Sequence, residues 1–197
     1  MIKRAFDLIC ALLGLLLLSP LLLLVAIAIK LDSPGPVFFR QERIGRHGRP
    51  FRIHKLRSMA ERQAAQASQI TIGADPRITR VGALIRRWKL DELVQLIDVV
   101  LGTMSLVGPR PEVARYVRLY PQEVARIVLS VRPGITDPAS IHFRNENELL
   151  GKSADPEKTY REIILPEKLK LQVAYVKQQS FFGDLVIIVR TIGSIGR

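Results

Sequence analysis

The most apolar part of the chain is one run near its start. Every residue from Leu8 to Ile29 is apolar except Ser19. As a single helix this run would be about 33 Å long, enough to cross a hydrocarbon core of about 30 Å. It continues too far for the short apolar core of a secretory signal, and no small-residue cleavage site follows it. We therefore expect a membrane helix that is retained in the mature protein.

Pro20 lies near the middle of this run and predicts a kink. Proline removes a backbone hydrogen bond, and the hydroxyl of Ser19 can bind the backbone group that is freed. Both flanks are basic, with Lys3 and Arg4 before the run and Lys30, Arg40 and Arg43 after it. Because basic flanks stay in the cytoplasm, the pattern favours a re-entrant helix hairpin over residues 1–32. The alternative is a proline-kinked helix that spans the membrane.

Residues 33–197 predict one cytoplasmic domain of α+β class that is mainly helical. Two segments of alternating polarity, Val37–Arg40 and Phe51–His54, flank a glycine-containing turn and predict a β-hairpin close to the membrane. The Ala/Gln-rich residues 60–75 predict a helix and a loop. The domain thus starts with a hairpin directly after the membrane segment.

Helical periodicity dominates the remaining chain. Apolar residues recur every three to five positions from Val81 to Leu101, which predicts an amphipathic helix interrupted near Lys89. The segment Gly108–Pro111 must be non-helical because of its two prolines. Further helical segments are predicted on either side of Pro121, over 168–178 and over 181–195. The last segment carries two charges, so we expect an interfacial or packed helix and not a second span.

The charge balance narrows the class of partner. Lys and Arg outnumber Asp and Glu by 30 to 18, and the formal net charge is +12. This excess implies an anionic partner, which can be nucleic acid, phospholipid or a phosphorylated substrate. The single cysteine, Cys10, excludes an intrachain disulfide, and the three histidines lack metal-ligand spacing. We expect no structural zinc.

The adjacent residues Asp91 and Glu92 are the first candidates for chemistry. On a regular helix their side chains diverge by about 100°, so two different roles suit them better than a shared proton. An ionised Asp91 can be a nucleophile while Glu92 holds Mg²⁺ against a diphosphate. If a helix begins at this point, Asp91 is its N-cap, and the helix dipole keeps the carboxylate ionised. A plain helix cap is the ordinary structural alternative.

Arg110 is the first candidate for phosphate binding. It lies between Pro109 and Pro111, which restrict the backbone and would orient the planar guanidinium for a bidentate contact with phosphate. An ordinary turn is the alternative. Further candidates for phosphate contacts are Lys55, Arg86, Arg87, Arg132 and Arg144.

Short motifs follow one another along nearly the whole chain. They are Lys3–Asp7 with Ser19-Pro20, Gly35–Gly45, Phe51–Met59, Asp75–Gly82, Leu90–Leu93, Gly102–Glu112 and Val131–Thr136. Each motif is short, but in this order they resemble the bacterial sugar transferase family, the monotopic polyprenyl-phosphate phosphoglycosyl transferases. The resemblance implies a re-entrant helix broken at Ser19-Pro20 and a catalytic domain on the cytoplasmic face of the bacterial inner membrane.

The resemblance also implies an activity and a set of site residues. Asp91 matches the nucleophile that attacks the sugar-bearing phosphate of a UDP-sugar, releases UMP and carries the phosphosugar until polyprenyl (undecaprenyl) phosphate displaces it. Glu92, beside Asp91, matches the acid associated with the required Mg²⁺. The residues that match phosphate-binding positions are Lys55, Arg86, Arg110 and Arg144. The implied partners are a UDP-sugar, polyprenyl phosphate and inner-membrane phospholipid. The implied pathway is the first membrane step of O-antigen, capsule or exopolysaccharide synthesis.

Two departures from the family pattern lie in the second half of the chain. The chain has Asp137-Pro138 where members commonly have Gly-Trp, which affects local geometry and sugar choice. Gln172 stands where an acidic residue often precedes the Tyr-Val pair. No motif specifies the sugar, and the oligomeric state stays open, a homo-oligomer included.

Two other functions fit parts of the sequence. A membrane-tethered nucleic-acid-binding or adaptor protein would explain the basic charge, but no nucleic-acid module motif is present, so we expect no nucleic acid as a partner. An aspartate-based phosphohydrolase would differ from a transferase only in letting water take the second step. Turnover without a lipid acceptor would distinguish the hydrolase.

Overall fold

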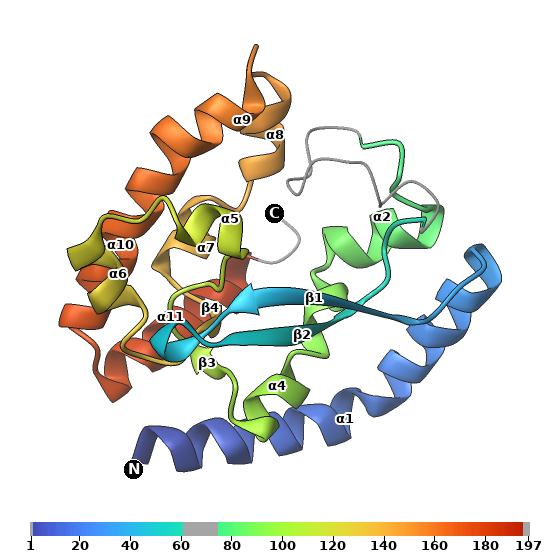
Figure 1. Cartoon of the computed structure of the whole chain (residues 1–197). Coiled ribbons are helices and arrows are strands. Elements are labelled where there is room, and N and C mark those ends of the chain that lie inside the picture. Colours follow the sequence, from blue (N-terminus) through green and yellow to red (C-terminus); the bar gives the residue numbers. More distant parts are fainter. Residues whose placement is uncertain (1, 61–74, 195–197) are drawn as a thin grey trace.

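The computed structural model describes residues 2–60 and 75–194 of the chain. It is mainly helical with two small sheets, which confirms the predicted α+β class. Figure 1 shows the long N-terminal helix along one side, the first sheet in the middle and most of the later helices on the other side. The helix and loop predicted over residues 60–75 fall almost entirely on residues 61–74, outside the described ranges.

The helix α1 is continuous from Ile2 to Asp32 with Pro20 inside it. Figure 1 shows it curving toward its C-terminal end. The hydroxyl of Ser19 donates a hydrogen bond of 2.8 Å to the carbonyl of Leu16. Leu16 lies four residues before Pro20, so its carbonyl is the one that a proline cannot serve. The predicted role of the Ser19 hydroxyl is therefore confirmed.

One face of α1 packs on the domain and the other is exposed. Ala11, Val25 and Ile29 are buried against the hairpin and the helices that follow it. The exposed apolar residues of α1 are Ile2, Ile9, Leu12, Leu13, Leu16, Leu17, Leu21, Leu23, Leu24, Ile27 and Leu31. By length and composition α1 could cross a membrane. Its outer face offers a long apolar surface.

Both ends of α1 are fastened to the same domain. Near the start, Arg4 donates a 2.7 Å hydrogen bond to a carbonyl of α4 (Leu96–Leu101), and Asp7 accepts one of 2.7 Å from the Ser105 hydroxyl. At the other end, Arg57 donates to the carbonyl of Ser33 at 2.6 Å. The two ends of α1 cannot separate from each other without breaking contacts with the domain.

The strands β1 (Phe38–Ile44) and β2 (Pro50–Leu56) form the predicted antiparallel hairpin. Phe38 pairs with Leu56 and Ile44 with Pro50. A short 3₁₀ turn, η1 (Arg46–Gly48), connects them. The hairpin directs Lys55, near the end of β2, toward the short helix that carries Asp91 and Glu92.

The chain from Val81 to Leu101 is helical but broken, as predicted. Helix α2 (Arg80–Arg87) begins at Thr79, whose hydroxyl accepts a 2.9 Å hydrogen bond from the Gly82 amide. Lys89 then adopts a left-handed conformation with φ of 56°, which ends α2 and starts α3 (Leu90–Leu93). Helix α4 follows. The turn at Lys89 brings the start of α3 beside β2.

A second sheet, which the sequence analysis did not predict, brings two distant motifs together. Strands β3 (Ser105–Val107) and β4 (Gly134–Thr136) pair in parallel. The approach is so close that a Cβ on Gly134 would lie 2.1 Å from the Gly108 nitrogen. Because parallel strands end at the same edge of a sheet, the segments that follow, with Arg110 and Asp137, lie side by side.

The remaining elements are helical, and most of them surround a core that includes Tyr116, Leu150, Tyr160 and Leu169. They are α5 (Ala114–Val117), α6 (Gln122–Val128), α7 (Pro138–His142), α8 (Glu146–Gly151), α9 (Pro156–Thr159), the π-helical turn η3 (Tyr160–Ile164), α10 (Leu165–Lys177) and α11 (Phe181–Ser194). The helices predicted around Pro121 and over 168–178 and 181–195 are confirmed.

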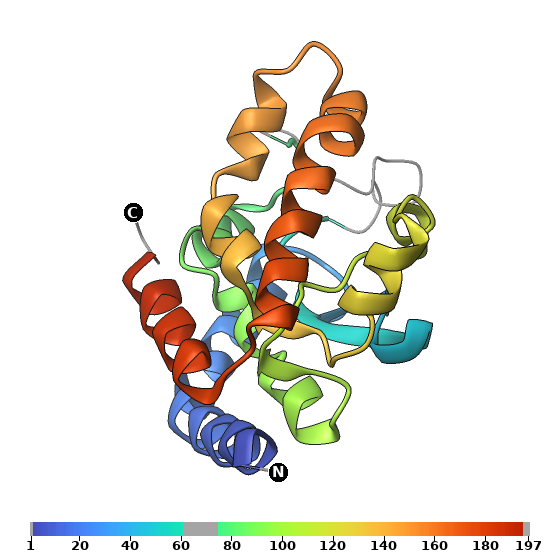
Figure 2. The ribbon, with the colours of Figure 1, turned by 90° about the vertical axis from the view of Figure 1, so that its left-hand side faces the viewer.

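Helix α11 packs on the domain through one side only. Asp184 is buried and accepts hydrogen bonds from Lys3 at 2.5 Å and Tyr175 at 2.8 Å. Figure 2 shows the start of α11 beside the N-terminal part of α1, from which α11 runs away toward the C-terminus. Its exposed apolar residues are Phe182, Val186, Val189 and Ile192. The packed contacts and the exposed apolar face agree with both forms of the prediction for this segment.

Candidate active site

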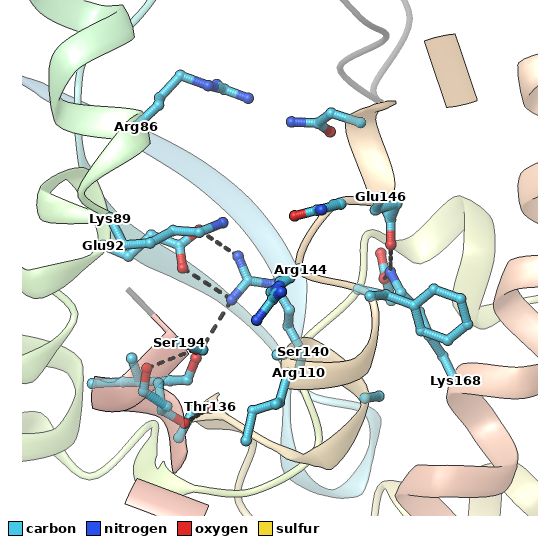
Figure 3. A pocket seen from close by; sticks show the side chains of 18 of the residues that line it. Arg86, Lys89, Glu92, Arg110, Thr136, Ser140, Arg144, Glu146, Lys168 and Ser194 are labelled. Atoms are coloured by element: carbon cyan, nitrogen blue, oxygen red, sulfur yellow. Dashed lines mark hydrogen bonds and ion pairs between the residues drawn. The ribbon is translucent and has the colours of Figure 1, made fainter. Parts of the chain in front are cut away.

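A cavity of about 530 Å³ contains all six residues that the sequence analysis placed at the site. Those residues are Lys55, Arg86, Asp91, Glu92, Arg110 and Arg144. They come from β2, α2, α3, the segment after β3 and the loop between α7 and α8, which Figure 3 shows surrounding one space. A second described cavity measures about 10 Å³ and is too small for a sugar nucleotide.

Asp91 lies in the first turn of α3 and is 2 % exposed. Its Oδ2 forms an ion pair with the Lys55 ammonium at 3.0 Å. Its Oδ1 is buried and has no hydrogen-bond partner among the described residues. The prediction that Asp91 is an N-cap is wrong: the left-handed turn at Lys89 starts the helix at Leu90, so Asp91 lies inside it. Its carboxylate is thus directed at Lys55 and the cavity.

Glu92 is held by two cations. Both guanidinium ends of Arg110 contact its carboxylate, Nη1 to Oε2 at 3.1 Å and Nη2 to Oε1, and Lys55 Nζ lies 3.2 Å from Oε1. Burial alone would raise the pKa of Glu92, but the charges of Arg110 and Lys55 outweigh it and hold this pKa well below its usual value. Glu92 is therefore ionised at neutral pH.

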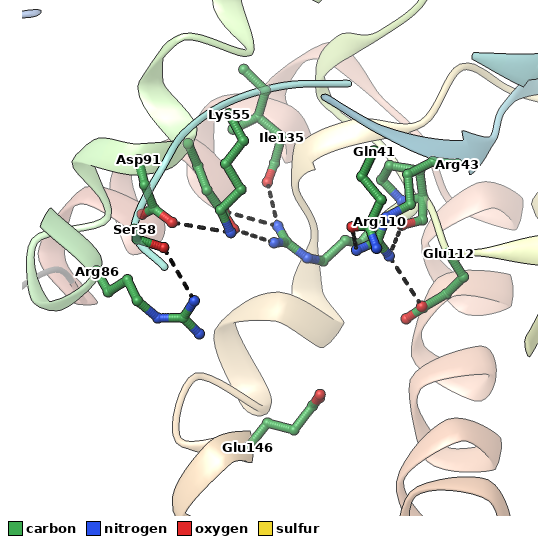
Figure 4. Close-up of polar contacts among 12 residues, drawn as sticks. Gln41, Arg43, Lys55, Ser58, Arg86, Asp91, Arg110, Glu112, Ile135 and Glu146 are labelled. Carbon is green, nitrogen blue, oxygen red and sulfur yellow. Dashed lines mark hydrogen bonds and ion pairs between the residues drawn. The ribbon is translucent and has the colours of Figure 1, made fainter. Parts of the chain in front are cut away.

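Lys55 joins the two carboxylates. The side chains of Asp91 and Glu92 were predicted to diverge along the helix. The ammonium of Lys55 still contacts one oxygen of each, because the lysine side chain is long and comes from another element. Figure 4 shows the Lys55 side chain reaching Asp91 from β2. Both carboxylates therefore form ion pairs with the same lysine.

Arg110 is fixed at both its backbone and its side chain. Its amide donates a 3.1 Å hydrogen bond to Asp137 Oδ2, and its segment is non-helical, as the flanking prolines predict. The charge of Glu92 raises the pKa of Arg110 above its already high value. The fork-to-carboxylate geometry is the one that the guanidinium would use on a phosphate.

Three of the other four predicted arginines line the cavity, and the fourth does not. Arg86 lines the cavity and its Nη1 donates to the Ser58 hydroxyl at 3.4 Å. Arg144 is exposed, and Figure 3 shows it in the middle of the cavity beside Arg110. Arg87 also lines the cavity. Arg132, a further candidate, is turned to the backbone, where its Nε donates to the Gly102 carbonyl at 2.8 Å.

The carboxylate pair fits a magnesium ion shared with a substrate. No group of three or more His, Cys, Asp or Glu side chains is assembled as a metal site within residues 2–60 and 75–194. Mg²⁺ in phosphoryl-transfer sites is, however, commonly held by one or two carboxylates together with substrate phosphates. The ionised Glu92 and the Asp91 carboxylate beside it are the groups that would supply such ligands.

The sequence analysis assigned no role to several residues that line the cavity or lie directly behind its lining. Asp137 and Gln172, noted there only as departures from a pattern, are in direct contact: Gln172 Nε2 donates to Asp137 Oδ2 at 2.9 Å. Ser140 joins them by donating its amide to Asp137 Oδ1 at 2.6 Å. At the far end the cavity is lined by Arg43, Glu112, Glu146, Tyr160 and Lys168. Arg43 and Glu112 lie within two of the sequence motifs, but the sequence analysis gave no member of this last group a role in the site.

Comparisons with known proteins agree with one another. A family model described as bacterial sugar transferase matches residues 1–197. The chain is 38% identical over 196 residues to an Aeromonas hydrophila UDP-N-acetylgalactosamine-undecaprenyl-phosphate N-acetylgalactosaminephosphotransferase. It is 39% identical over 199 residues to an Escherichia coli UDP-glucose:undecaprenyl-phosphate glucose-1-phosphate transferase. It is also 39% identical over 202 residues to the exopolysaccharide production protein PSS of Rhizobium leguminosarum.

The coverage differs between these relatives. Each alignment includes 98% of the present chain, but only 43% and 39% of the first two relatives and 94% of the third. The chain thus spans about two fifths of the length of the first two.

Proposed function

Because the chain belongs to the bacterial sugar transferase family, we propose that it transfers a phosphosugar from a UDP-sugar to polyprenyl (undecaprenyl) phosphate and releases UMP. The observation that carries this proposal is the convergence of Asp91, Glu92, Lys55 and Arg110 in one cavity large enough for a sugar nucleotide. The names of the relatives, which include a UDP-sugar and undecaprenyl phosphate, support the two substrates. The reaction would be the first membrane step in the synthesis of a cell-surface polysaccharide.

The first step is a displacement at phosphorus. Asp91 uses its unpartnered Oδ1 to attack the sugar-bearing phosphorus, and the bond between that phosphorus and the oxygen of UMP breaks. The electron pair leaves with UMP. Lys55 and Arg110, which neutralise Asp91 and Glu92 in the structure, transfer their contacts to the phosphate oxygens. Arg86 and Arg144 line the same space and add positive charge.

The second step restores the enzyme. An oxygen of polyprenyl phosphate attacks the same phosphorus, and the bond to Asp91 breaks, so the carboxylate is regenerated and a polyprenyl diphosphate sugar forms. Mg²⁺, when held by Glu92 and Asp91, would neutralise the diphosphate in the first step. The lipid acceptor must reach the cavity from the membrane, which makes the orientation of α1 part of the function.

UMP release tests this function directly. With a panel of UDP-sugars and undecaprenyl phosphate, at least one donor should give sustained, Mg²⁺-dependent UMP release. Without the lipid, release should stop after at most about one UMP per active site, as a covalent intermediate requires. Continued turnover without lipid would identify a phosphohydrolase, and no release from any donor would refute the proposal.

We further propose that α1 enters the inner membrane from the cytoplasmic face and returns to it. Both ends of α1 are attached to the one domain, through Asp7 near its start and through Arg57 after its end, so a domain on one side implies both ends on that side. The exposed apolar faces of α1 and α11 would contact lipid. Phe38 and Phe39, exposed at the start of β1, support a position of the hairpin at the same surface.

Cysteine labelling tests this topology. In a background with Cys10 replaced by serine, single cysteines at the exposed positions Ile2 and Arg49 should both react with an impermeant reagent from the cytoplasmic side only. Replacing Ser19 and Pro20 with leucine removes the proline that favours a bend in the helix and should move the N-terminal label toward the periplasmic side. An Ile2 label that is already periplasmic in the native sequence would exclude the re-entrant arrangement.

A further inference from the structure

Four buried polar atoms, all on residues that line the cavity, have no hydrogen-bond partner in the described part of the chain. They are Arg43 Nε, Asp91 Oδ1, Ser140 Oγ and Gln172 Oε1. Most buried polar atoms in folded proteins are paired, so such atoms around a cavity mark positions where a bound molecule supplies the partner. Asp91 has a role in the proposed reaction, but Ser140 and Gln172 have none.

The orientation of Gln172 is settled by its neighbour. Gln172 is 2 % exposed on α10, and its amide nitrogen donates to Asp137 Oδ2 at 2.9 Å. The reverse orientation would put the amide oxygen against the carboxylate, which offers no proton. Oε1 is therefore the free end, and it can only accept a hydrogen bond.

Asp137 holds this corner rigid. It is fully buried, at 0 % exposed, and accepts from the Arg110 amide at 3.1 Å and the Ser140 amide at 2.6 Å as well as from Gln172. Ser140 and Gln172 are thus bound to the two oxygens of one carboxylate. Their unpartnered oxygens belong to one small, preorganised unit.

The chemistry of this unit selects its ligand. The Ser140 hydroxyl can donate or accept, whereas Gln172 Oε1 needs a donor. A ligand hydroxyl would satisfy both by accepting from Ser140 and donating to Gln172, and an amide N–H would satisfy Gln172. A phosphate oxygen is excluded, because it offers no proton to Gln172 and would lie close to the buried Asp137 carboxylate.

The position of the unit identifies which part of the donor it meets. Arg110 is bound to Asp137 through its backbone and to Glu92 through its guanidinium, so one arginine side chain separates the unit from the carboxylate pair. One oxygen links the sugar to the phosphorus that Asp91 attacks, while the nucleoside is one phosphate further away. We propose that Gln172 and Ser140, held by Asp137, bind a hydroxyl or acetamido N–H of the donor's sugar and so select the UDP-sugar. This assignment rests on the proposed transferase function.

Substitutions at the two residues test the assignment. Gln172→Met keeps the length of the side chain but removes the acceptor, and Ser140→Ala is a milder second variant. Gln178→Met, at an exposed position at the end of the same helix, is the matched control. The measurements are kcat/KM for UMP release from a panel of UDP-sugars, including analogues that each lack one hydroxyl, and inhibition by UDP. Thermal unfolding confirms that each variant is folded.

We expect Gln172→Met to lower kcat/KM for the preferred UDP-sugar by about 10-fold or more and to change the ranking of the sugars. Inhibition by UDP should be unchanged, because UDP lacks the sugar. Removing one particular hydroxyl from the donor should lower kcat/KM of the native enzyme as much as the substitution does. The same removal should lower kcat/KM of the variant little further.

Other results would overturn the assignment. If UDP inhibition weakens in step with the UDP-sugars, the unit binds the nucleoside. An equal loss for every sugar and analogue would mean that the unit only positions Arg110, and unchanged kinetics would mean that it holds a buried water. If the native protein releases no UMP from any donor, the proposed transferase function is wrong.

The sugar-binding assignment can then be tested without turnover, by measuring the affinities of UDP and UDP-sugars by calorimetry. Gln172→Met should abolish any difference in affinity between a UDP-sugar and UDP.

Discussion

Asp91→Asn should abolish UMP release both with and without polyprenyl phosphate. Asparagine is nearly isosteric with aspartate, but its amide is far less nucleophilic than a carboxylate, so the first displacement cannot occur. The native enzyme, incubated with UDP-sugar and Mg²⁺ without lipid, should gain the mass of one phosphosugar. Peptide mapping should place that mass on Asp91, and the Asp91→Asn variant should gain none.

The structure gives reason to expect that this variant folds. Asp91 Oδ1 has no partner within the described ranges, and Oδ2 has only the Lys55 ion pair, so the substitution removes one contact and no packing volume. The thermal midpoint should therefore stay close to that of the native protein. Loss of activity without loss of fold would assign the effect to chemistry.

Glu92→Gln should fail in a different way and serves as the neighbouring comparison. Glutamine can still accept a hydrogen bond from Arg110, but it loses the charge that would hold Mg²⁺ against the diphosphate. UMP release should become severely slow and should recover in part at higher Mg²⁺, with the adduct still mapping to Asp91. If UMP appears only when both substrates are present and no adduct forms, the displacement is direct. Asp91 is then a base or a metal ligand.

Arg110→Lys should lower kcat/KM by about 10²-fold or more although the positive charge is kept. Arg110 places two nitrogens on the two oxygens of Glu92 in the structure, and a lysine ammonium cannot reproduce this planar two-point contact on a phosphate. The backbone bond from position 110 to Asp137 does not depend on the side chain and should survive. Steady-state UMP release over a range of UDP-sugar concentrations measures the effect.

A matched control separates this effect from a general loss of arginine. Arg126 is exposed and forms only a surface ion pair with Glu123 within α6, so Arg126→Lys should leave kcat/KM unchanged. Activity of Arg110→Lys close to native at every donor concentration would reduce Arg110 to a turn residue. An equal loss in both variants would point to the overall basic charge instead.

Local patterns were enough to predict the hairpin and most of the helices of this protein, but not the strands β3 and β4. The alternating segments before and after the turn at Gly45–Gly48 specified the hairpin, because a period of two fits only an extended chain. Pro20 leaves the carbonyl of Leu16 without its helical donor, and the Ser19 hydroxyl could be predicted to bind it because the residues are close in sequence. The break near Lys89 followed from the interrupted apolar periodicity. Each of these features depends on residues a few positions apart.

The geometry of the site was decided by tertiary structure. The parallel pairing of β3 with β4 joins segments about thirty residues apart, and nothing in either three-residue strand announces its partner. The left-handed Lys89 started α3 two residues earlier than an Asp91 cap would, and Lys55 reached both carboxylates from a different element. Likewise, Asp137 and Gln172 are separate positions in the sequence and one hydrogen-bonded unit in the fold. Sequence periodicity reports the conformation of neighbouring residues, whereas which distant side chains meet depends on how whole elements pack, so the candidate residues followed from the sequence and their partners only from the fold.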